Sequence, residues 1–510
     1  MSSYSSGRAR RGVFHTAIFR AVSQACTLAS YVVLVRSMSE HNFGVLSLLY
    51  AVIPVISTVA SFGIEQTLRR FQPEYLSSGR PEAALWLVRV ASVTRLGSNL
   101  LLLSLIFLLW DRIAPVFKLG PYEREFLLFS VLILLHFQSA ILQLSLSSQM
   151  LLGHAGAMVA LLSATKLVAY LALAGMHELN LTTAIIADTT AYVIMYVGLR
   201  IVHYTRVTRA SKGKFAPTPA ERKRLLKFSF YNNFNDAGSL LLSQASDSLF
   251  IGALLNPVAA GTYSFYTRLN EMCTQLLPIR QFGNVIQPVF FGVKREESAV
   301  RMPRYFTLLT NLTLLVQWPL LAFAIAYHRE LVTVVFHGKF VEYSWLLPMV
   351  MGFATLNRFQ DPASMVVQYE EKSSVLLLSK IFAIYNVIAI LVLVKTLGIW
   401  GAAIANGTGQ LMKNFFIWWH VRKVAVWTNL RAVIVSALLI WGGAVAVCYL
   451  LKTFVPLPPV LHMLAGLVIC GVAMLIYVRS PALSASDRQI LGSVFHGRER
   501  RLLAAVGIVR

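Results

Sequence analysis

Long apolar stretches recur along the chain and alternate with short polar connections. A helix needs about 20 apolar residues to cross the hydrocarbon core of a bilayer. The pattern therefore predicts an all-α membrane protein with about 14 transmembrane helices. The predicted spans are 13–36, 43–67, 84–110, 125–148, 155–176, 181–204, 228–253, 260–292, 305–327, 344–369, 375–394, 400–420, 432–451 and 458–478.

The composition agrees with this pattern. Hydrophobic residues make up 56% of the chain and charged residues 13%, whereas soluble domains have about 45–50% and about 25%. The net charge is +24, but the basic residues lie between apolar runs and not on one soluble module, so we predict no nucleic-acid partner. The four cysteines lie in apolar runs without CxxC spacing, which favours buried small residues over a disulfide or metal site.

The basic residues also predict the orientation. With the N-terminus in the cytoplasm, the cytoplasmic connections hold 28 Lys and Arg residues and the opposite connections hold 7. Lys and Arg are enriched in cytoplasmic loops. We therefore predict that both termini are cytoplasmic.

One long basic connection divides the chain. We predict an N-terminal lobe at 1–204 (spans 1–6), a basic cytoplasmic linker at 205–227, a C-terminal lobe at 228–420 (spans 7–12), and two extra spans with a cytoplasmic tail at 421–510. At the end of the linker, Thr218, Pro219 and Glu221 have the spacing of a helix N-cap, N1 and N3. This spacing predicts a capping box.

Landmarks of the first six spans recur in spans 7–12 at an offset of 215 to 218 residues. The matching positions are Gly44 and Gly261, Pro73 and Pro288, and Ala187 and Ala405. Odd and even spans keep the same orientation, so the repeat is parallel and predicts two pseudo-symmetric six-helix lobes. Spans 13 and 14 lie outside this repeat.

The seventh span carries a polar stripe at helical spacing: Asn232, Asp236, Ser239, Ser243, Ser246 and Asp247. The first span has polar residues at five equivalent positions: Thr16, Arg20, Ser23, Thr27 and Tyr31. A polar stripe in hydrocarbon is costly unless it faces water or partners. We expect the two stripes to face a central cavity between the lobes; the alternative is hydrogen bonding between helices within each lobe.

Further charges fall inside predicted spans. Arg268 and Glu271 lie on one face of the eighth span, Lys166 at the centre of the fifth, and Arg358 with Asp361 near the middle of the tenth. Intramembrane cations are functional candidates by default, although Arg358 and Asp361 could also be a structural pair. A cationic cavity suits a phosphate-bearing substrate.

The sequence contains neither GxxxxGK[ST] nor HExxH. We predict no catalytic residues, no cofactor and no metal, so the chain is expected not to be an enzyme.

Three stretches carry a resemblance to a known family: "RGVFHTAIFRAVSQACTLASYVVLVRSMSEHNFGVLSLLYAV", "FGIEQTLRRFQPE" and "LGIWGAAIANGTGQ". The chain resembles the polysaccharide exporters, the Wzx-type O-antigen and exopolysaccharide flippases, of the multidrug/oligosaccharidyl-lipid/polysaccharide (MOP) superfamily. The resemblance implies a V-shaped, two-lobed fold like that of MATE transporters, alternating access, an undecaprenyl-pyrophosphate-linked oligosaccharide as substrate, and coupling to H⁺ or Na⁺. It also implies the bacterial inner membrane, with possible contacts to the polysaccharide polymerase.

Candidate roles follow for eight residues. The substrate-binding candidates are Arg20, Thr27, Lys166, Arg268 and Arg358. The acids available for ion coupling are Asp236, Asp247 and Glu271.

Other functions remain open. The alternatives are another exporter of the superfamily, such as a lipid II flippase or a drug/cation antiporter, and, less favoured, a polysaccharide polymerase or ligase. A drug antiporter is expected to have an acidic cavity and twelve spans. A polymerase or ligase needs a large outer loop, and the longest outer connections here are 111–124 and 328–343.

Overall fold

The computed structural model describes residues 6–209, 215–275, 277, 295–370, 372–484 and 487–489, without the side chains of 6–17 and of a few further residues. Contacts divide the chain into two compact units, Met1–Thr262 and Tyr263–Arg510. Every regular element in the described ranges is helical, which confirms the predicted all-α class.

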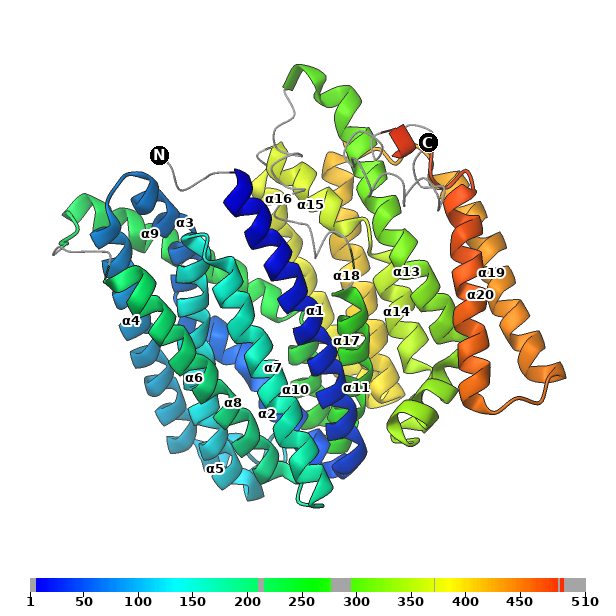
Figure 1. The fold of residues 1–510 in the computed structure, drawn as a ribbon, viewed down its shortest axis with the longest axis horizontal. Helices are drawn as coiled ribbons and strands as arrows, with labels where there is room; N and C mark the ends of the chain where they lie inside the picture. Colours follow the sequence, from blue (N-terminus) through cyan, green and yellow to red (C-terminus); the bar gives the residue numbers. More distant parts are fainter. Residues whose placement is uncertain are drawn as a thin grey trace. The chain divides into compact units, whose positions relative to one another are not determined.

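The first unit contains α1 to α10 and the start of α11. Their bounds are α1 Ser6–Ser37, α2 Glu40–Ser61, α3 Ile64–Ser77, α4 Pro81–Leu108, α5 Trp110–Ile113, α6 Glu123–Ser148, α7 Leu152–Gly175, α8 Leu181–His203, α9 Pro219–Leu240, α10 Gln244–Leu254 and α11 Pro257–Thr274. In this unit α1 runs along α7, and α6 and α7 both pack against α8 (Figure 1).

The second unit contains the rest of α11 and the helices that follow. Their bounds are α13 Ser298–Phe336, α14 Leu346–Leu356, α15 Gln360–Tyr369, α16 Ser373–Leu378, α17 Phe382–Leu397, α18 Ile399–Val421, α19 Leu430–Phe454 and α20 Pro459–Arg479. Here α17 packs on α18, and α19 and α20 both pack on α13 (Figure 1).

Ten helical segments among the described residues are long and apolar enough to cross a membrane. They are Ile18–Ser37, Glu40–Ser61, Pro81–Leu108, Gly120–Ser148, Leu152–Gly175, Leu181–Thr208, Ser298–Phe336, Ser374–Leu397, Leu430–Phe454 and Pro459–Arg479. The chain is therefore a multi-pass membrane protein, and these ten are consistent with the predicted fourteen.

Several predicted spans differ from the helices observed. The second ends at Ser61 and resumes as α3 after Gly63, whose φ of +68° is a left-handed conformation that favours glycine. The tenth is interrupted between α14 and α15. The seventh is divided into α9 and α10, because the Ser243 side chain accepts a hydrogen bond from the Ser246 amide and starts a new helix. The expectation of one continuous polar helix through this region was wrong.

The predicted lobes follow the sequence repeat, whereas contacts place the unit boundary within α11. The cause is that α9 packs on α2 and α3, and α10 packs on α2, so both helices belong to the first unit. The lobes at 1–204 and 228–420 stay a prediction.

Two glycines of the repeat meet within the first unit. A Cβ atom on Gly44 would lie 2.1 Å from the carbonyl oxygen of Pro257, and one on Gly261 would lie 2.6 Å from the Cα atom of Gly44. Such distances are below van der Waals contact. The close approach of α2 to the first turn of α11 therefore requires glycine at both positions. Pro288, part of another matching pair, lies outside the described residues.

The longest helix, α13, has 39 residues and a kink. Tyr327 interrupts it with non-helical angles of φ −129° and ψ 21°. The Tyr327 side chain is fully buried, and a Cβ atom on Gly466 of α20 would lie 2.2 Å from its ring. Lys452 of α19 lies over the same ring at 4.6 Å from the centroid. The kink is therefore enclosed by both C-terminal helices.

Candidate functional site

A buried ion pair lies among the apolar helices of the first unit. Lys166 on α7 and Asp188 on α8 approach to 2.9 Å between Nζ and Oδ1. The Asp188 side chain is 1% exposed and that of Lys166 is 20% exposed. The two charges cancel, which lowers the cost of placing them inside a membrane protein.

Tyrosine hydroxyls complete the coordination of Asp188. Tyr170 donates to Oδ1 at 2.8 Å, and Tyr50 of α2 donates to Oδ2. Lys166 Nζ also donates to the Tyr50 hydroxyl at 3.2 Å. Three helices, α2, α7 and α8, are thus joined at one carboxylate. We call Tyr50, Lys166, Tyr170 and Asp188 the Asp188 cluster.

A fourth helix borders the cluster. The Tyr192 ring lies 5.5 Å from Lys166 Nζ, within the range of a cation–π contact. The hydroxyl of Tyr192 is 3.0 Å from Nδ1 of His136 on α6. These contacts extend the polar network to α6. No group of three or more metal-ligating side chains occurs in the part of the chain that the structure describes.

The sequence identified Lys166 as a candidate site residue, but it did not identify the other three members of the Asp188 cluster. The signal was present in the spacing: Lys166 and Tyr170, and likewise Asp188 and Tyr192, are separated by four residues and share a helix face. Two such polar pairs on consecutive apolar helices indicate facing surfaces. The sequence could not predict that Tyr50 joins this cluster, because its position depends on how α2 packs against α7 and α8.

In the polar stripe of α1, two side chains form hydrogen bonds to α7 and another is exposed. Ser23 is 2.8 Å from the Ser163 hydroxyl of α7, and Thr27 donates to the same hydroxyl at 3.3 Å. These two hydrogen bonds join α1 to α7. For Ser23 and Thr27 the structure therefore supports the alternative of hydrogen bonding between helices. Arg20, three residues before Ser23, has an exposed side chain.

The corresponding stripe of α9 and α10 is also divided. Asn233, the residue after the stripe position Asn232, accepts a hydrogen bond from Ser61 of α2 at 2.9 Å. Asp247, in the first turn of α10, is fully buried. The side chain of Asp236 lies outside the described part of the structure.

The predicted residues of the second unit lie on different elements. Arg268 Nη1 contacts Glu271 Oε2 at 3.0 Å on α11, and both side chains are about half exposed. Arg358 lies between α14 and α15, partly buried, and its Nε donates to the Ala354 carbonyl. Asp361 lies in the first turn of α15. None of these placements tests the roles predicted from the sequence.

A second buried cation supports the break between α2 and α3. Arg95 of α4 is completely buried and lies 4.0 Å from the Phe137 ring centroid. Its guanidinium donates to the Ser57 carbonyl at 3.1 Å and approaches Glu65 of α3 to 3.5 Å. Arg95 therefore binds both helices that meet at Gly63.

Comparison with known proteins gives the family. Residues 9–292 match the family described as polysaccharide biosynthesis protein, which is more than half of the chain. The chain belongs to this family. The polysaccharide biosynthesis assignment agrees with the resemblance carried by the sequence. No curated protein matches the chain in sequence.

Solved structures give the fold of this member of the polysaccharide biosynthesis family. It is similar to "Lipid II flippase MurJ, inward closed conformation", with a TM-score of 0.69 and 14% identity over 91% of this chain and 97% of that one. It is also similar to an inward-facing multidrug resistance MATE family transporter of the MOP superfamily, with a TM-score of 0.58 and 14% identity over 80% of this chain and 98% of that one. A third is a MOP superfamily transporter from Pyrococcus furiosus, with a TM-score of 0.55 and 15% identity over 82% of this chain and 96% of that one.

The predicted polysaccharide family and the predicted fold class are therefore confirmed. The similar solved structures are named as a flippase and a transporter.

Proposed function

We propose that the chain is a flippase that moves an undecaprenyl-pyrophosphate-linked oligosaccharide across the bacterial inner membrane during the synthesis of O-antigen, capsule or exopolysaccharide. The observation that carries this proposal is the combination of family and fold. The family match names polysaccharide biosynthesis, and a similar structure that covers 91% of this chain is called a lipid II flippase. The MATE family match covers 80%, which favours a lipid-linked cargo over a drug.

Alternating access is the proposed mechanism, with both termini in the cytoplasm. The sequence contains no nucleotide-binding fingerprint, so an ion gradient or removal of the product on the far side would drive transport. Asp236, Asp247 and Glu271 are the proposed ion-coupling acids. Full burial suits Asp247 to this role, because a buried carboxylate is stabilised by binding a cation or proton.

Arg20 and Arg268 are proposed to bind the pyrophosphate of the substrate. Both guanidinium groups are exposed, and arginine binds phosphate oxygens in bidentate fashion. Thr27 and Arg358 are proposed as further contacts. Lys166 can contribute only if it leaves Asp188, since their contact at 2.9 Å occupies its ammonium group.

Transport of the lipid-linked sugar by the purified protein in proteoliposomes tests the proposal. We expect Arg20→Ala and Arg268→Ala each to lower the rate at least tenfold, with Arg→Lys partly restoring it because lysine lacks the planar fork. Arg112→Ala, which removes an exposed arginine from the 111–124 connection, is the matched control. Equal rates for all three alanine variants would remove the arginines from substrate binding.

The same vesicles distinguish the cargo and the coupling. Lipid II and a cationic drug, offered in place of the undecaprenyl-pyrophosphate-linked oligosaccharide, test the alternative exporters. If an ion is coupled, Asp236→Asn or Asp247→Asn should make transport insensitive to an imposed H⁺ or Na⁺ gradient. Acceleration by the gradient that persists in Asp247→Asn and Glu271→Gln would exclude both acids.

A further inference from the structure

One face of the first half of α9 packs against the rest of the first unit. Leu225 is buried in a cluster with Leu68, Phe71 and Tyr75. The Phe228 ring packs edge-on against that of Phe71, with 5.3 Å between the centroids. This face of α9 is therefore fixed on α3 by apolar contacts.

Ion pairs fix the same face. Arg224 donates to both carboxylate oxygens of Glu74 at 2.8 and 3.2 Å. Glu221 contacts Arg80 at 3.0 Å and also completes the capping box with Thr218, as the sequence predicted. A bidentate contact and a cap give this helix a defined orientation.

The opposite face of α9 is basic and apolar at once. Arg222, Lys223, Leu226, Lys227 and Phe230 are exposed and share this face by their helical spacing. Leu226 is 71% exposed and Phe230 is 62% exposed. We call these five residues the α9 outer face.

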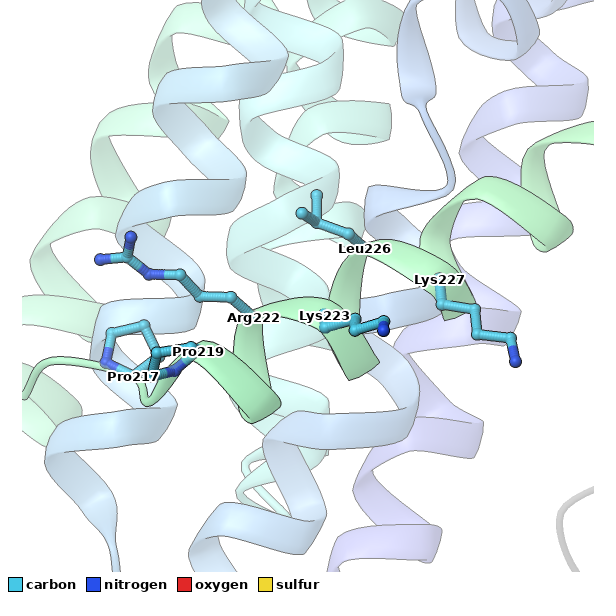
Figure 2. A pocket seen from close by; sticks show the side chains of 6 residues that line it. All are labelled: Pro217, Pro219, Arg222, Lys223, Leu226 and Lys227. Carbon is cyan, nitrogen blue, oxygen red and sulfur yellow. The ribbon is translucent and has the colours of Figure 1, made fainter.

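A groove with a volume of ≈680 Å³ runs along part of this face. It is lined by Pro217, Pro219, Arg222, Lys223, Leu226 and Lys227. Figure 2 shows the two prolines where α9 begins and the four other side chains along its first turns. The lining thus combines three cations with two prolines and one leucine.

The cations of the groove have no acidic partner in the described part of the chain. Among the residues that the structure describes, no carboxylate forms an ion pair with Arg222, Lys223 or Lys227. Glu221, next to Arg222 in the chain, is bound by Arg80, and Glu74 of the adjacent helix α3 is bound by Arg224. The lining residues of the groove therefore carry a net positive charge and can attract anions.

The position of α9 along the bundle indicates which anion. Glu221 contacts Arg80, the residue directly before α4, and α4 is one of the membrane-spanning helices. The end of a span lies at the boundary between hydrocarbon and water, where phospholipid headgroups are found. The predicted side of this boundary is the cytoplasmic one.

We propose that the α9 outer face binds the headgroups of anionic phospholipids in the bilayer. Arg222, Lys223 and Lys227 contact the phosphates, and Leu226 and Phe230 enter the acyl region, as in interfacial amphipathic helices. The proposed lipid is a permanent neighbour of the transporter and not its cargo. The inference therefore does not depend on which lipid-linked sugar the chain moves.

The test is thermal unfolding of the purified full chain in detergent with added short-chain lipid. A ligand that binds only the folded state raises Tm, so phosphatidylglycerol should raise Tm and zwitterionic phosphatidylcholine should not. In Lys223→Gln/Lys227→Gln the dissociation constant for phosphatidylglycerol should rise about thirtyfold. Leu226→Ser should weaken binding without altering its dependence on salt.

Arg112→Gln/Arg124→Gln is the matched control, because it also removes two exposed cations and should leave the phosphatidylglycerol effect unchanged. Equal Tm shifts with both lipids, or a full shift in Lys223→Gln/Lys227→Gln, would overturn the proposal. A shift produced by inorganic phosphate alone would also overturn it, since the groove would then bind free anions and not a lipid surface.

Discussion

At the scale of single residues, Asp188 is the centre of a buried polar network in the first unit. It accepts hydrogen bonds from Tyr50 and Tyr170 and pairs with Lys166. Removing one partner of a buried pair leaves the other charge uncompensated, at a cost of about 3–5 kcal/mol. We therefore expect Asp188→Asn to lower the Tm of the purified protein by several degrees.

The double variant Lys166→Met/Asp188→Asn separates the charge from the packing. It should recover most of the loss, because neither charge then remains in the bundle. A double variant that is as unstable as the sum of the two single variants would show that the pair contributes little coupling. Lys166→Met alone serves as the second single variant of the cycle.

The contacts of individual residues were the feature that the sequence predicted least well. Lys166 was predicted because a cation in an apolar helix is conspicuous without any structure. Its partner Asp188 lies 22 positions further along the chain, on the next helix. Which carboxylate faces which ammonium depends on helix rotation, and composition and hydropathy do not determine helix rotation.

At the scale of elements, the approach of α2 to α11 depends on two glycines. A methyl group on Gly44 would lie 2.1 Å from the carbonyl oxygen of Pro257, so the helices must separate to accept it. We expect Gly44→Ala to lower Tm. Gly442→Ala is the control, since nothing lies within 4 Å of the corresponding methyl position on α19, and it should leave Tm unchanged or slightly raised. Equal Tm values for the two variants would contradict the close packing.

The docking of α9 on α3 should depend on pH. The guanidinium of Arg224 lowers the pKa of Glu74 below its ordinary value of 4.5. The Thr218 backbone amide, followed by Arg80, lowers the pKa of Glu221 in the same direction. Carboxylates with lowered pKa stabilise the folded state above the ordinary value and cease to do so as pH falls through the folded one.

Acid titration should therefore weaken this contact from about pH 4.5 downward. Limited proteolysis in the 205–227 linker measures the effect, with a protease active in acid. Cleavage of the native chain should increase as pH falls, while Glu74→Gln/Glu221→Gln should be cleaved readily at neutral pH and change little with acid. A native chain whose cleavage is flat across this range would contradict the role of both acids.

The elements themselves were predicted to differing degrees. Hydropathy located the apolar helices because one long run suffices to identify each of them. It did not locate the breaks at Gly63, Ser243 and Asn357, because a break of two or three residues hardly changes the average hydropathy of a window. The capping box at Thr218 was predictable because its chemistry is local.

At the scale of the whole molecule, the central prediction is the membrane topology, which fixes the side on which each connection lies. Reporter fusions after residues 80, 215, 298 and 490 should report the cytoplasm, and fusions near 118 and 335 the opposite side. The reason is the excess of Lys and Arg, 28 against 7, in one set of connections. A cytoplasmic signal at 118 would invalidate the alternation and with it the proposed side of the α9 outer face.

The length of α13 has a mechanical consequence. At 1.5 Å per residue its 39 residues extend about 58 Å, nearly twice the hydrocarbon thickness of about 30 Å. The segment from Ser298 to the kink at Tyr327 is about 43 Å long. A rotation of about 10° at the kink would therefore displace the far end by about 7 Å. Because Gly466 of α20 and Lys452 of α19 pack against Tyr327, such a rotation would have to take place against these two C-terminal helices.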